Sequence, residues 1–367
     1  MTASCPRVCL DARLTGFPGI GRFIVGLWGA LRRTDLDLVV LGPGRRREDW
    51  LGAAGYAAPG PVVTFDARPF LPGEQLLLPS LLKRSGIDVH HSPHLTVPYL
   101  SRRPIVLTVH DLFFYKDRSK ARSSSAGRYY RAAFPAAVRR ASVIVAGSPY
   151  ARRELTDVLG VPERKLRTID YGLDHDRFRP VAPSEYETRL LALGVRTPYL
   201  LYVGTAKPHK NLTTLLAAHR GADLPPLVLA GPTPAELDAS CPTWQEGGRT
   251  VALGRVPDEA LPSLYSAAMA LAIPSLYESL GFPAVEAMAC GTAVVASDGG
   301  GLPDTVGDDG LLVPATDVGA WRESLTKVVN DESLQLRLAE AGRQRAALRD
   351  WSKAARRYTD VYRDVAG

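Results

Sequence analysis

Short apolar runs alternate with amphipathic segments along nearly the whole chain. The runs are rich in valine, isoleucine and leucine, which is typical of parallel strands covered on both faces. In the first half they predict strands at residues 8–10, 38–41, 62–65, 89–91, 105–109, 143–146 and 166–169. In the second half they predict strands at residues 199–203, 227–230, 250–253, 269–273, 293–296 and 311–313.

Helical periodicity fills most of the gaps between these strands. The predicted helices are residues 21–32, 73–85, 128–140, 151–159, 212–219, 258–266, 283–289, 318–330 and 332–347. The alternation pauses at residues 178–183, which hold two prolines and form the best linker. A chain of 367 residues also exceeds the size at which single cores usually stop growing. We therefore predict an α/β protein with two Rossmann-like domains, 1–182 and 183–349, facing across a cleft.

The composition is that of an ordinary globular protein, with 46% apolar and 23% charged residues. The four cysteines lack the spacing of a zinc site or a disulfide framework, so we expect reduced thiols. We find no signal peptide and no run near the ~18 apolar residues of a membrane span. These features predict a cytoplasmic protein or one bound peripherally at the inner face of the membrane. The richness in alanine, arginine, glycine and proline suggests a high-GC bacterial source.

The net charge of +7 is concentrated in one segment. Residues 112–140 hold eight basic residues and one acidic residue, an excess equal to that of the whole chain. Apolar residues recur there at helical spacing, and Pro135 should kink or divide the helix. Residues 116–140 could dock on an anionic membrane, or they could form a core-facing helix with a solvated basic face. The charge alone does not make the chain a nucleic-acid-binding protein.

The most informative segment is residues 275–297, which reads as a loop, a short helix, a glycine stop at Gly291 and a buried strand. Glu278 precedes the helix and Glu286 lies within it. Small residues in the loop let backbone N–H groups approach a ligand, and the start of a helix favours an anion. Anion-binding amides flanked by two carboxylates suit a phosphorylated, polyhydroxylated ligand, and a nucleotide sugar has both properties.

Two glutamates separated by seven residues around a Gly-Phe-Pro turn are similar to the signature of retaining, GT-B-fold glycosyltransferases of family 4. Ser279 stands where that signature usually has its first glycine. The resemblance implies that Glu278 contacts the donor sugar and Glu286 the nucleotide ribose. It also implies that residues 350–367 form a helix that crosses back onto the first domain. The rest of the implied donor loop is Ser279, Leu280, Gly281 and Phe282.

A basic turn follows the first strand of the second half. The strand ends at Gly204, and Lys207 and Lys210 then precede an asparagine cap and a helix. Anions bind at this position in open α/β sheets. By resemblance the two lysines clamp the donor diphosphate, and His209 stands where the family frequently has arginine. The turn at Arg255 and Val256 would hold the nucleobase, mainly through backbone atoms.

Two segments of the first half are candidates for the acceptor and phosphate side. Gly19, Gly21 and Arg22 follow the first strand, although their spacing lacks the full dinucleotide-binding fingerprint. His110 and Asp111 follow the strong strand at residues 105–109, and the resemblance places His110 at the reacting centre.

The remaining histidines and acids do not predict a metal site. His90, His91 and His94 have spacing that does not suit one helical face, so we interpret His91 as part of an acceptor wall. Asp174 and Asp176 resemble a metal-binding Asp-x-Asp of another glycosyltransferase fold, but lie in a loop that matches family 4. We therefore expect neither a metal nor another cofactor.

The resemblance implies a metal-independent retaining transferase that moves a hexose from a nucleotide-diphosphate sugar to a hydroxyl acceptor. GDP-mannose is the favoured donor, with UDP- and dTDP-sugars as alternatives. The acceptor would be an envelope glycan or glycolipid, or a natural-product scaffold. The alternatives are a sugar-nucleotide epimerase of the same fold and a binder that holds the donor without reaction.

Overall fold

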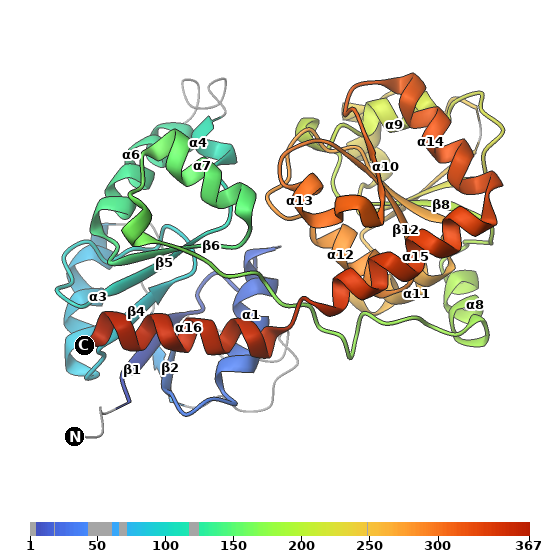
Figure 1. Cartoon of the computed structure of the whole chain (residues 1–367). Coiled ribbons are helices and arrows are strands. Elements are labelled where there is room, and N and C mark those ends of the chain that lie inside the picture. The colour runs from blue at the N-terminus through green and yellow to red at the C-terminus, as the bar shows by residue number, and fades with distance from the viewer. Residues whose placement is uncertain (1–4, 18, 43–60, 66–71, 117–124, 248) are drawn as a thin grey trace. The chain divides into compact units, whose positions relative to one another are not determined.

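In the computed structural model the chain forms two compact units (Figure 1). Unit 1 comprises Met1–Gly172 and Asp350–Gly367, and unit 2 comprises Leu173–Arg349. The structure describes residues 5–17, 19–42, 61–65, 72–116, 125–247 and 249–367. The sequence pattern placed the division at 182/183, beside the two prolines, whereas the units meet at 172/173.

Unit 1 is built on a seven-stranded sheet in which every neighbouring pair is parallel. Its strand order is β3-β2-β1-β4-β5-β6-β7. All seven predicted strands of the first half are present. The strands are β1 (Arg7–Asp11), β2 (Asp37–Gly42), β3 (Val62–Thr64), β4 (Val89–Ser92), β5 (Ile105–Val109), β6 (Val143–Ala146) and β7 (Leu166–Thr168).

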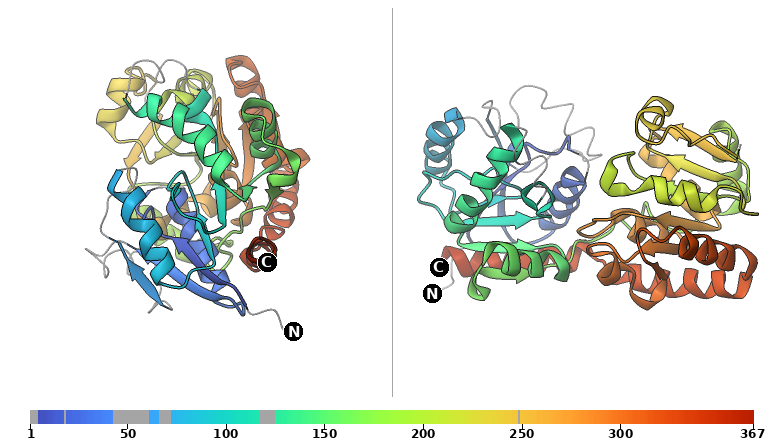
Figure 2. Two further views of the ribbon diagram at one scale, coloured as in Figure 1. Left: turned by 90° about the vertical axis from the view of Figure 1, so that its left-hand side faces the viewer. Right: turned by 90° about the horizontal axis from the view of Figure 1, so that it is seen from above.

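Helices cover the sheet of unit 1, and the last of them comes from the far end of the chain. Helix α16 packs against α1 and β4, so the C-terminal segment belongs to the first unit (Figures 1 and 2). Gly26 makes this packing close, because a Cβ there would lie 2.2 Å from the Trp351 ring. The described helices are α1 (Ile20–Leu31), α3 (Pro72–Arg84), α4 (Phe113–Lys116), α6 (Ser125–Arg140), α7 (Pro149–Leu159), the 3₁₀ helix η1 (Glu163–Lys165) and α16 (Trp351–Ala366).

Unit 2 repeats the plan with a six-stranded parallel sheet in the order β10-β9-β8-β11-β12-β13. Its strands are β8 (Leu200–Val203), β9 (Leu227–Ala230), β10 (Thr250–Gly254), β11 (Ala270–Ile273), β12 (Ala293–Ser297) and β13 (Leu311–Val313). Its helices are α8 (Pro183–Ala192), η2 (Pro208–Lys210), α9 (Leu212–His219), α10 (Pro234–Ser240), η3 (Asp258–Ala260), α11 (Leu261–Ala267), α12 (Phe282–Ala289), α13 (Leu302–Val306), η4 (Gly307–Asp309), α14 (Val318–Asn330) and α15 (Glu332–Ala347).

Each sheet has one point at which the strand order reverses. In unit 1 this switch point lies between β1 and β4, and in unit 2 it lies between β8 and β11. Loops at the carboxyl ends of such strands diverge, and open α/β sheets bind their ligands there. Most candidate residues of unit 2 follow β8 and β11, while Arg255 and Val256 follow β10. Those of unit 1 follow β1 and β5, except His91, which lies within β4.

Several helices were not predicted from the sequence, and they are mostly short. The helices α8, α10 and α13 each begin with a proline in the first turn, where its fixed φ is tolerated, and such short segments give little periodicity. Of the two expectations for Pro135, a kinked or a divided helix, the structure decides the second: Pro135 does not divide the helix. Helix α6 continues as a single element through this residue.

Candidate functional site

The first part of the candidate site follows β8 in unit 2. Gly204 comes directly after the strand, and a Cβ there would meet the Tyr202 hydroxyl at 2.8 Å. The chain then turns through η2, which leaves Lys207 exposed and Lys210 half-buried. Both lysines therefore lie at the carboxyl edge of the sheet, beside the switch point.

Asn211 connects this turn to the neighbouring loops. Its φ of 53° is the one positive value at a non-glycine residue in the described part of the chain. Its side-chain amide donates to the carbonyl oxygens of Pro274 at 3.0 Å and Ala315 at 2.7 Å. The Leu276 amide also donates to the His209 carbonyl at 2.8 Å. The loops after β8 and β11 thus hold each other in place.

Glu278 lies in the loop after β11 and faces the basic turn. Its Oε1 accepts hydrogen bonds from Lys210 Nζ at 2.6 Å and from Ser275 Oγ at 2.9 Å. The two charged side chains are 14% and 22% exposed, so this ion pair is shielded from water but not sealed off. Charge-assisted hydrogen bonds of this length are among the stronger ones in proteins. The structure therefore brings together two predicted donor-site residues.

A glycine turn after β12 supports the Glu278 loop. The Gly301 amide donates to the Glu278 carbonyl at 2.7 Å. A Cβ on Gly300, whose φ is +63°, would lie 2.3 Å from that same oxygen, and one on Gly299 would lie 2.4 Å from the Ser275 carbonyl. These glycines allow a close backbone approach that no other residue permits. Sequence reasoning did not assign them a role, although three consecutive glycines were the available signal.

Glu286 lies on α12 and differs from Glu278 in its surroundings. It is only 1% exposed, and its Oε2 accepts a hydrogen bond from the Tyr265 hydroxyl at 2.8 Å. Helix α12 begins after Gly281, whose φ of 78° is left-handed and whose Cβ would meet Leu302 at 2.7 Å. The contact of Glu286 with a ribose stays a prediction, and it would require the ribose to reach a nearly buried carboxylate.

The other predicted donor residues line the same edge. Ser279 and Phe282 are half-buried, whereas Leu280 is buried and its carbonyl accepts a hydrogen bond from Thr305 at 2.5 Å. Arg255 is exposed after β10, and Val256 packs against the core of unit 2. In the sheet, β9 and β8 lie between β10 and β11. The turn after β10 therefore lies farther from the Glu278 loop along the carboxyl edge than the turn after β8 does.

In unit 1 the loop after β1 requires its glycines. Gly19 caps α1 with a φ of 81°. A Cβ on Gly21 would lie 2.0 Å from the Thr15 carbonyl oxygen, and the Gly21 amide donates to the Phe17 carbonyl at 2.7 Å. Arg22 is half-buried in the first turn of α1. Loop packing thus explains Gly21 whether or not a ligand contacts it.

His110 follows β5 and is held on both sides of its ring. Its Nε2 lies 2.7 Å from the Pro93 carbonyl oxygen, and its Nδ1 lies 2.8 Å from the Tyr171 hydroxyl. Burial lowers the pKa of His110 to about 3, which keeps the ring neutral at ordinary pH. The neighbouring Asp111 accepts a hydrogen bond from the Phe113 amide at 2.9 Å and so caps α4.

His91 does not lie on an acceptor wall. Its side chain is fully buried, with Nδ1 2.7 Å from the Tyr362 hydroxyl of α16 and Nε2 2.8 Å from Thr108 Oγ1. Both ring nitrogens are therefore occupied by core hydroxyls. The prediction was wrong because His91 is in the strand itself, and its side chain points into the packing between the sheet and α16.

No group of three or more His, Cys, Asp or Glu residues is arranged to hold a metal ion within the described ranges. His90 is fully buried, and neither of its ring nitrogens has a hydrogen-bond partner among the described residues. Asp174 accepts a hydrogen bond from the Arg177 amide at 3.2 Å and closes a turn. His175 is bonded to the Arg349 carbonyl at 2.8 Å. The Asp-x-Asp segment is thus part of a structured turn.

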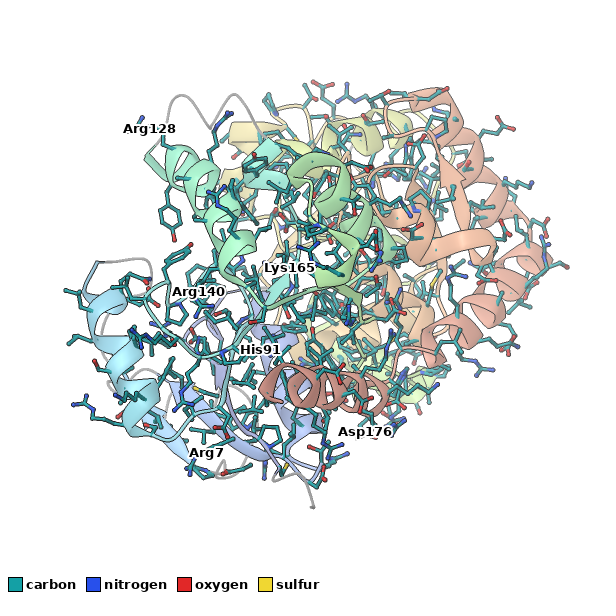
Figure 3. All side chains as sticks on the ribbon, turned by 60° about the vertical axis from the view of Figure 1, so that its left-hand side comes forward. Arg7, His91, Arg128, Arg140, Lys165 and Asp176 are labelled. Carbon is teal, nitrogen blue, oxygen red and sulfur yellow. The ribbon has the colours of Figure 1, made fainter. Side chains whose placement is uncertain are left out.

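In the described part of the basic segment of unit 1, residues 112–140, most apolar side chains are buried or half-buried and several basic side chains are exposed. Of the apolar stripe that could have faced a membrane, Phe134, Ala137, Val138 and Ala141 are buried in the core of unit 1, and Tyr130 is half-buried against it. Arg140 donates to the carbonyls of Tyr99, Ser101 and Arg103, and Lys165 donates to carbonyls at the end of α6. Figure 3 labels both side chains, together with Arg128. Arg128, Arg131 and Arg139 are exposed.

Asp117, Arg118, Lys120 and Arg122 lie outside the described residues. No helix among those described is long and apolar enough to span a membrane.

Comparison with known proteins agrees with this arrangement. A family model described as "Glycosyltransferase Family 4" matches residues 18–177, and one described as "Glycosyl transferases group 1" matches residues 190–345. The chain is 29% identical to an O-antigen chain mannosyltransferase B of Escherichia coli, over 75% of this chain and 74% of that one. It is 32% identical to an α-maltose-1-phosphate synthase of Mycobacterium tuberculosis, over 71% and 73%.

Solved structures share the fold over nearly the whole chain. A sucrose-phosphate synthase from Thermosynechococcus elongatus superimposes with a TM-score of 0.79 at 23% identity and covers 98% of both chains. Anabaena HepE in complex with UDP and glucose superimposes with a TM-score of 0.77 at 20% identity, over 97% of this chain and 99% of that one. These likenesses confirm the predicted GT-B fold.

Proposed function

The chain belongs to glycosyltransferase family 4, and from this premise we propose that it is a retaining hexosyltransferase whose donor site is the switch point of unit 2. As a member of this family it uses a nucleotide sugar. The observation that carries the assignment of the site is the pairing of Lys210 with Glu278 at the carboxyl ends of β8 and β11. A cation beside a hydrogen-bond-accepting carboxylate suits the two halves of a nucleotide sugar, its diphosphate and its sugar hydroxyls.

Each proposed donor contact follows from the chemistry of the side chain. Lys210 and the exposed Lys207 would neutralise the diphosphate, with the first turn of α12 near the same edge of the sheet. Glu278 would accept hydrogen bonds from sugar hydroxyls, because an ionised carboxylate is an acceptor only. The backbone at Arg255 and Val256 would hold the base. We propose GDP-mannose as the donor, which the mannosyltransferase among the relatives supports. UDP- and dTDP-sugars are the competing donors.

The proposed reaction keeps the configuration at the anomeric carbon. The bond between the anomeric carbon and the diphosphate oxygen breaks as the acceptor oxygen approaches from the same face. The acceptor proton passes to the departing diphosphate oxygen, so that atoms and charges balance without a protein nucleophile. Lys207 and Lys210 would stabilise the charge that develops on the leaving group, an electrostatic effect that is usually the largest in such catalysis.

We propose that no metal ion takes part. The lysine pair would supply the positive charge that a divalent ion supplies at a diphosphate in other enzymes. Asp174 and Asp176, the best metal-ligand candidates of the sequence, lie in a turn in which Asp174 accepts a backbone hydrogen bond. Activity in the presence of EDTA would agree with the proposal. Loss of activity that Mn²⁺ or Mg²⁺ restores would contradict it.

On the acceptor side we propose a hydroxyl of an envelope glycan or glycolipid, with natural-product scaffolds as the alternative. A peripheral contact of unit 1 with an anionic membrane would suit a lipid-linked acceptor. What supports this contact is the charge of Arg128 and Arg131, which are exposed on α6. Phe114 of the neighbouring α4 is 42% exposed and would add an apolar contact. The contact would be mainly electrostatic, because the apolar stripe of α6 is buried.

A panel of nucleotide sugars tests the proposed function. Ligands that bind the folded state raise its melting temperature according to their concentration over Kd, so the true donor should give the largest shift. Incubation of that donor with candidate acceptors, followed by NMR of the product, then shows whether the anomeric configuration is kept. Interconversion of the donor sugar without acceptor would favour an epimerase instead. Binding without turnover of any acceptor would favour a non-catalytic binder.

A further inference from the structure

We propose that Tyr171 is a positioning residue that holds His110 as a neutral ring with its proton on Nε2, so that His110 serves the reaction as a fixed polar ring and not as a proton-transfer group. The inference rests on the proposed function for its catalytic consequence. Its structural part concerns unit 1 alone.

The two hydrogen bonds of the ring determine where its proton lies. The Pro93 carbonyl can only accept, so Nε2, 2.7 Å away, must carry hydrogen. A neutral imidazole then has an unprotonated Nδ1, which can only accept. The Tyr171 hydroxyl, 2.8 Å from Nδ1, is therefore the donor of that bond. With both nitrogens engaged, the ring has no site left at which to take or give a proton during the reaction.

The surroundings favour this neutral state. Burial of the Tyr171 side chain raises its pKa well above the ordinary value, so its hydroxyl stays protonated and remains a donor. The His94 ring lies 6.4 Å from that of His110 and further disfavours a positive charge, while the Pro93 carbonyl opposes this in part. Asp111 follows His110 in the chain and its carboxylate is turned to the Phe113 amide. Phe23 of α1 packs edge-on to the His110 ring, with centroids 4.9 Å apart.

Tyr171 is itself held by residues from three parts of unit 1. Its ring stacks on Trp351 of α16 at 6.4 Å with planes 13° apart, and it contacts Phe23 at 4.7 Å. Gly147 makes room for it, because a Cβ there would lie 2.0 Å from the Tyr171 ring. A Cβ on the adjacent Gly172 would lie 2.3 Å from the Trp351 backbone. Such close support fixes the hydroxyl that orients His110.

The chain supplies a matched control in the same unit. His91 has the same arrangement, with a tyrosine hydroxyl at 2.7 Å from Nδ1 and a second partner at Nε2. This second pair, His91 and Tyr362, lies in the packing against α16 and not at the end of a strand. Tyr171→Phe and Tyr362→Phe therefore remove the same hydroxyl-to-histidine bond, one beside the predicted reacting centre and one in the core.

Nitrogen NMR of the ¹⁵N-histidine-labelled full chain provides the test. We expect the wild-type His110 signal to show the Nε2–H neutral form from pH 5.5 to 8, assigned by its loss in His110→Asn. Tyr171→Phe should shift Nδ1 toward a free nitrogen or mix the two tautomers, and should lower kcat about tenfold with a smaller change in KM. Tyr362→Phe should leave the His110 signal and kcat near wild-type values, and change the His91 signal.

The outcomes separate this inference from the proposed function. A wild-type His110 that is protonated near pH 7, or that carries its proton on Nδ1, would overturn the inference without any activity measurement. The same conclusion follows if Tyr171→Phe keeps both the wild-type tautomer and the wild-type kcat. If Tyr171→Phe does not fold, by circular dichroism and thermal melting, the wild-type spectrum and its pH series decide alone. A protein that shows the expected tautomer but turns over no nucleotide sugar would contradict only the proposed function.

Discussion

Lys210 Nζ lies 2.6 Å from Glu278 Oε1, across a sequence separation of 68 residues. The pair joins the two loops that leave the sheet of unit 2 on either side of its switch point. Both side chains keep some exposure, so their attraction contributes modestly to stability, about 1 kcal/mol or less. Its importance is positional. Each partner holds the other at the edge of the sheet where a ligand would arrive.

Replacing the carboxylate tests the proposed sugar contact. Glu278→Gln keeps the shape of the side chain but removes its charge, so hydroxyls of the sugar lose a strong acceptor and Lys210 loses its partner. We expect kcat/KM to fall about 100-fold, which corresponds to roughly 2.7 kcal/mol of transition-state stabilisation, while the melting temperature changes little. Steady-state kinetics with the identified donor measure this. The exposed Glu323 of α14, changed to glutamine, serves as the control, and wild-type kinetics for Glu278→Gln would contradict the assignment.

Removing the lysine should affect the part of the ligand that all donors share. Lys210→Ala is expected to weaken binding of the free nucleoside diphosphate and of the intact donor by similar factors, because both carry the phosphates. Calorimetric titration of each ligand measures this. Lys327→Ala, an exposed lysine on α14 of the same unit, is the matched control. Weaker binding of the donor with unchanged binding of the nucleoside diphosphate would place the phosphate clamp elsewhere.

Two glycines near the start of α1, Gly16 in the loop after β1 and Gly21 in the first turn of the helix, differ in how closely they are packed. A Cβ on Gly21 would lie 2.0 Å from the Thr15 carbonyl, whereas one on Gly16 would meet nothing within 4 Å. Gly21→Ala should therefore force the loop after β1 to move and destabilise the fold by about 1–3 kcal/mol. Gly16→Ala should be close to neutral. Urea unfolding of the two variants compares them directly, and equal stabilities would show that the loop accommodates the methyl group.

Buried histidines of unit 1 should make its stability sensitive to acid. Burial lowers the pKa of His90 and His94 to about 4 and that of His91 and His110 to about 3. Below pH 6.5 these histidines bind protons in the unfolded chain but stay unprotonated in the folded chain. Stability is complete above pH 6.5 and is lost as the pH falls toward 3–4, by about 1.4 kcal/mol per pH unit for each such histidine.

Urea unfolding at pH 7.5, 6.5 and 5.5 measures this slope. The variant His90→Leu removes a ring that has no hydrogen-bond partner among the described residues. Its free energy of unfolding should therefore change less steeply with pH than that of the wild type, by the equivalent of about one bound proton. It should lose little stability at pH 5.5, since an apolar side chain replaces unsatisfied nitrogens. A free energy of unfolding that does not change between pH 7.5 and 5.5 would contradict the prediction.

Sedimentation with lipid vesicles tests the proposed membrane contact of unit 1. The protein should pellet with anionic vesicles and not with neutral ones, and ~0.5 M salt should release it by screening. Changing Arg128 and Arg131 together to glutamine should weaken the pelleting. Changing Arg139 alone, which lies near the other end of α6, should have less effect. Equal and negligible pelleting with both vesicle types would favour an acceptor free in solution.

The pattern of apolar runs was sufficient to predict the architecture. All thirteen strands in the described part of the chain were located, because a strand buried in a parallel sheet is a short apolar run that can be recognised from its own residues. The two glutamates and the two lysines were also visible, since each lies in a short segment with its own turn or cap. In these places local sequence and tertiary structure agree.

Pairing and burial depended on the folded structure. The sequence could not show that Lys210 contacts Glu278, that Glu286 is buried against Tyr265, or that α6 directs its apolar stripe into the core.

Adjacent histidines make the same point. His90 and His91 stand side by side in β4, yet His91 bonds to a tyrosine from the last helix of the chain and His90 to none of the described residues. Whether a buried polar side chain is hydrogen-bonded depends on which donors and acceptors lie within about 3 Å of it. Those partners are set by the packing of elements that are far apart in the sequence.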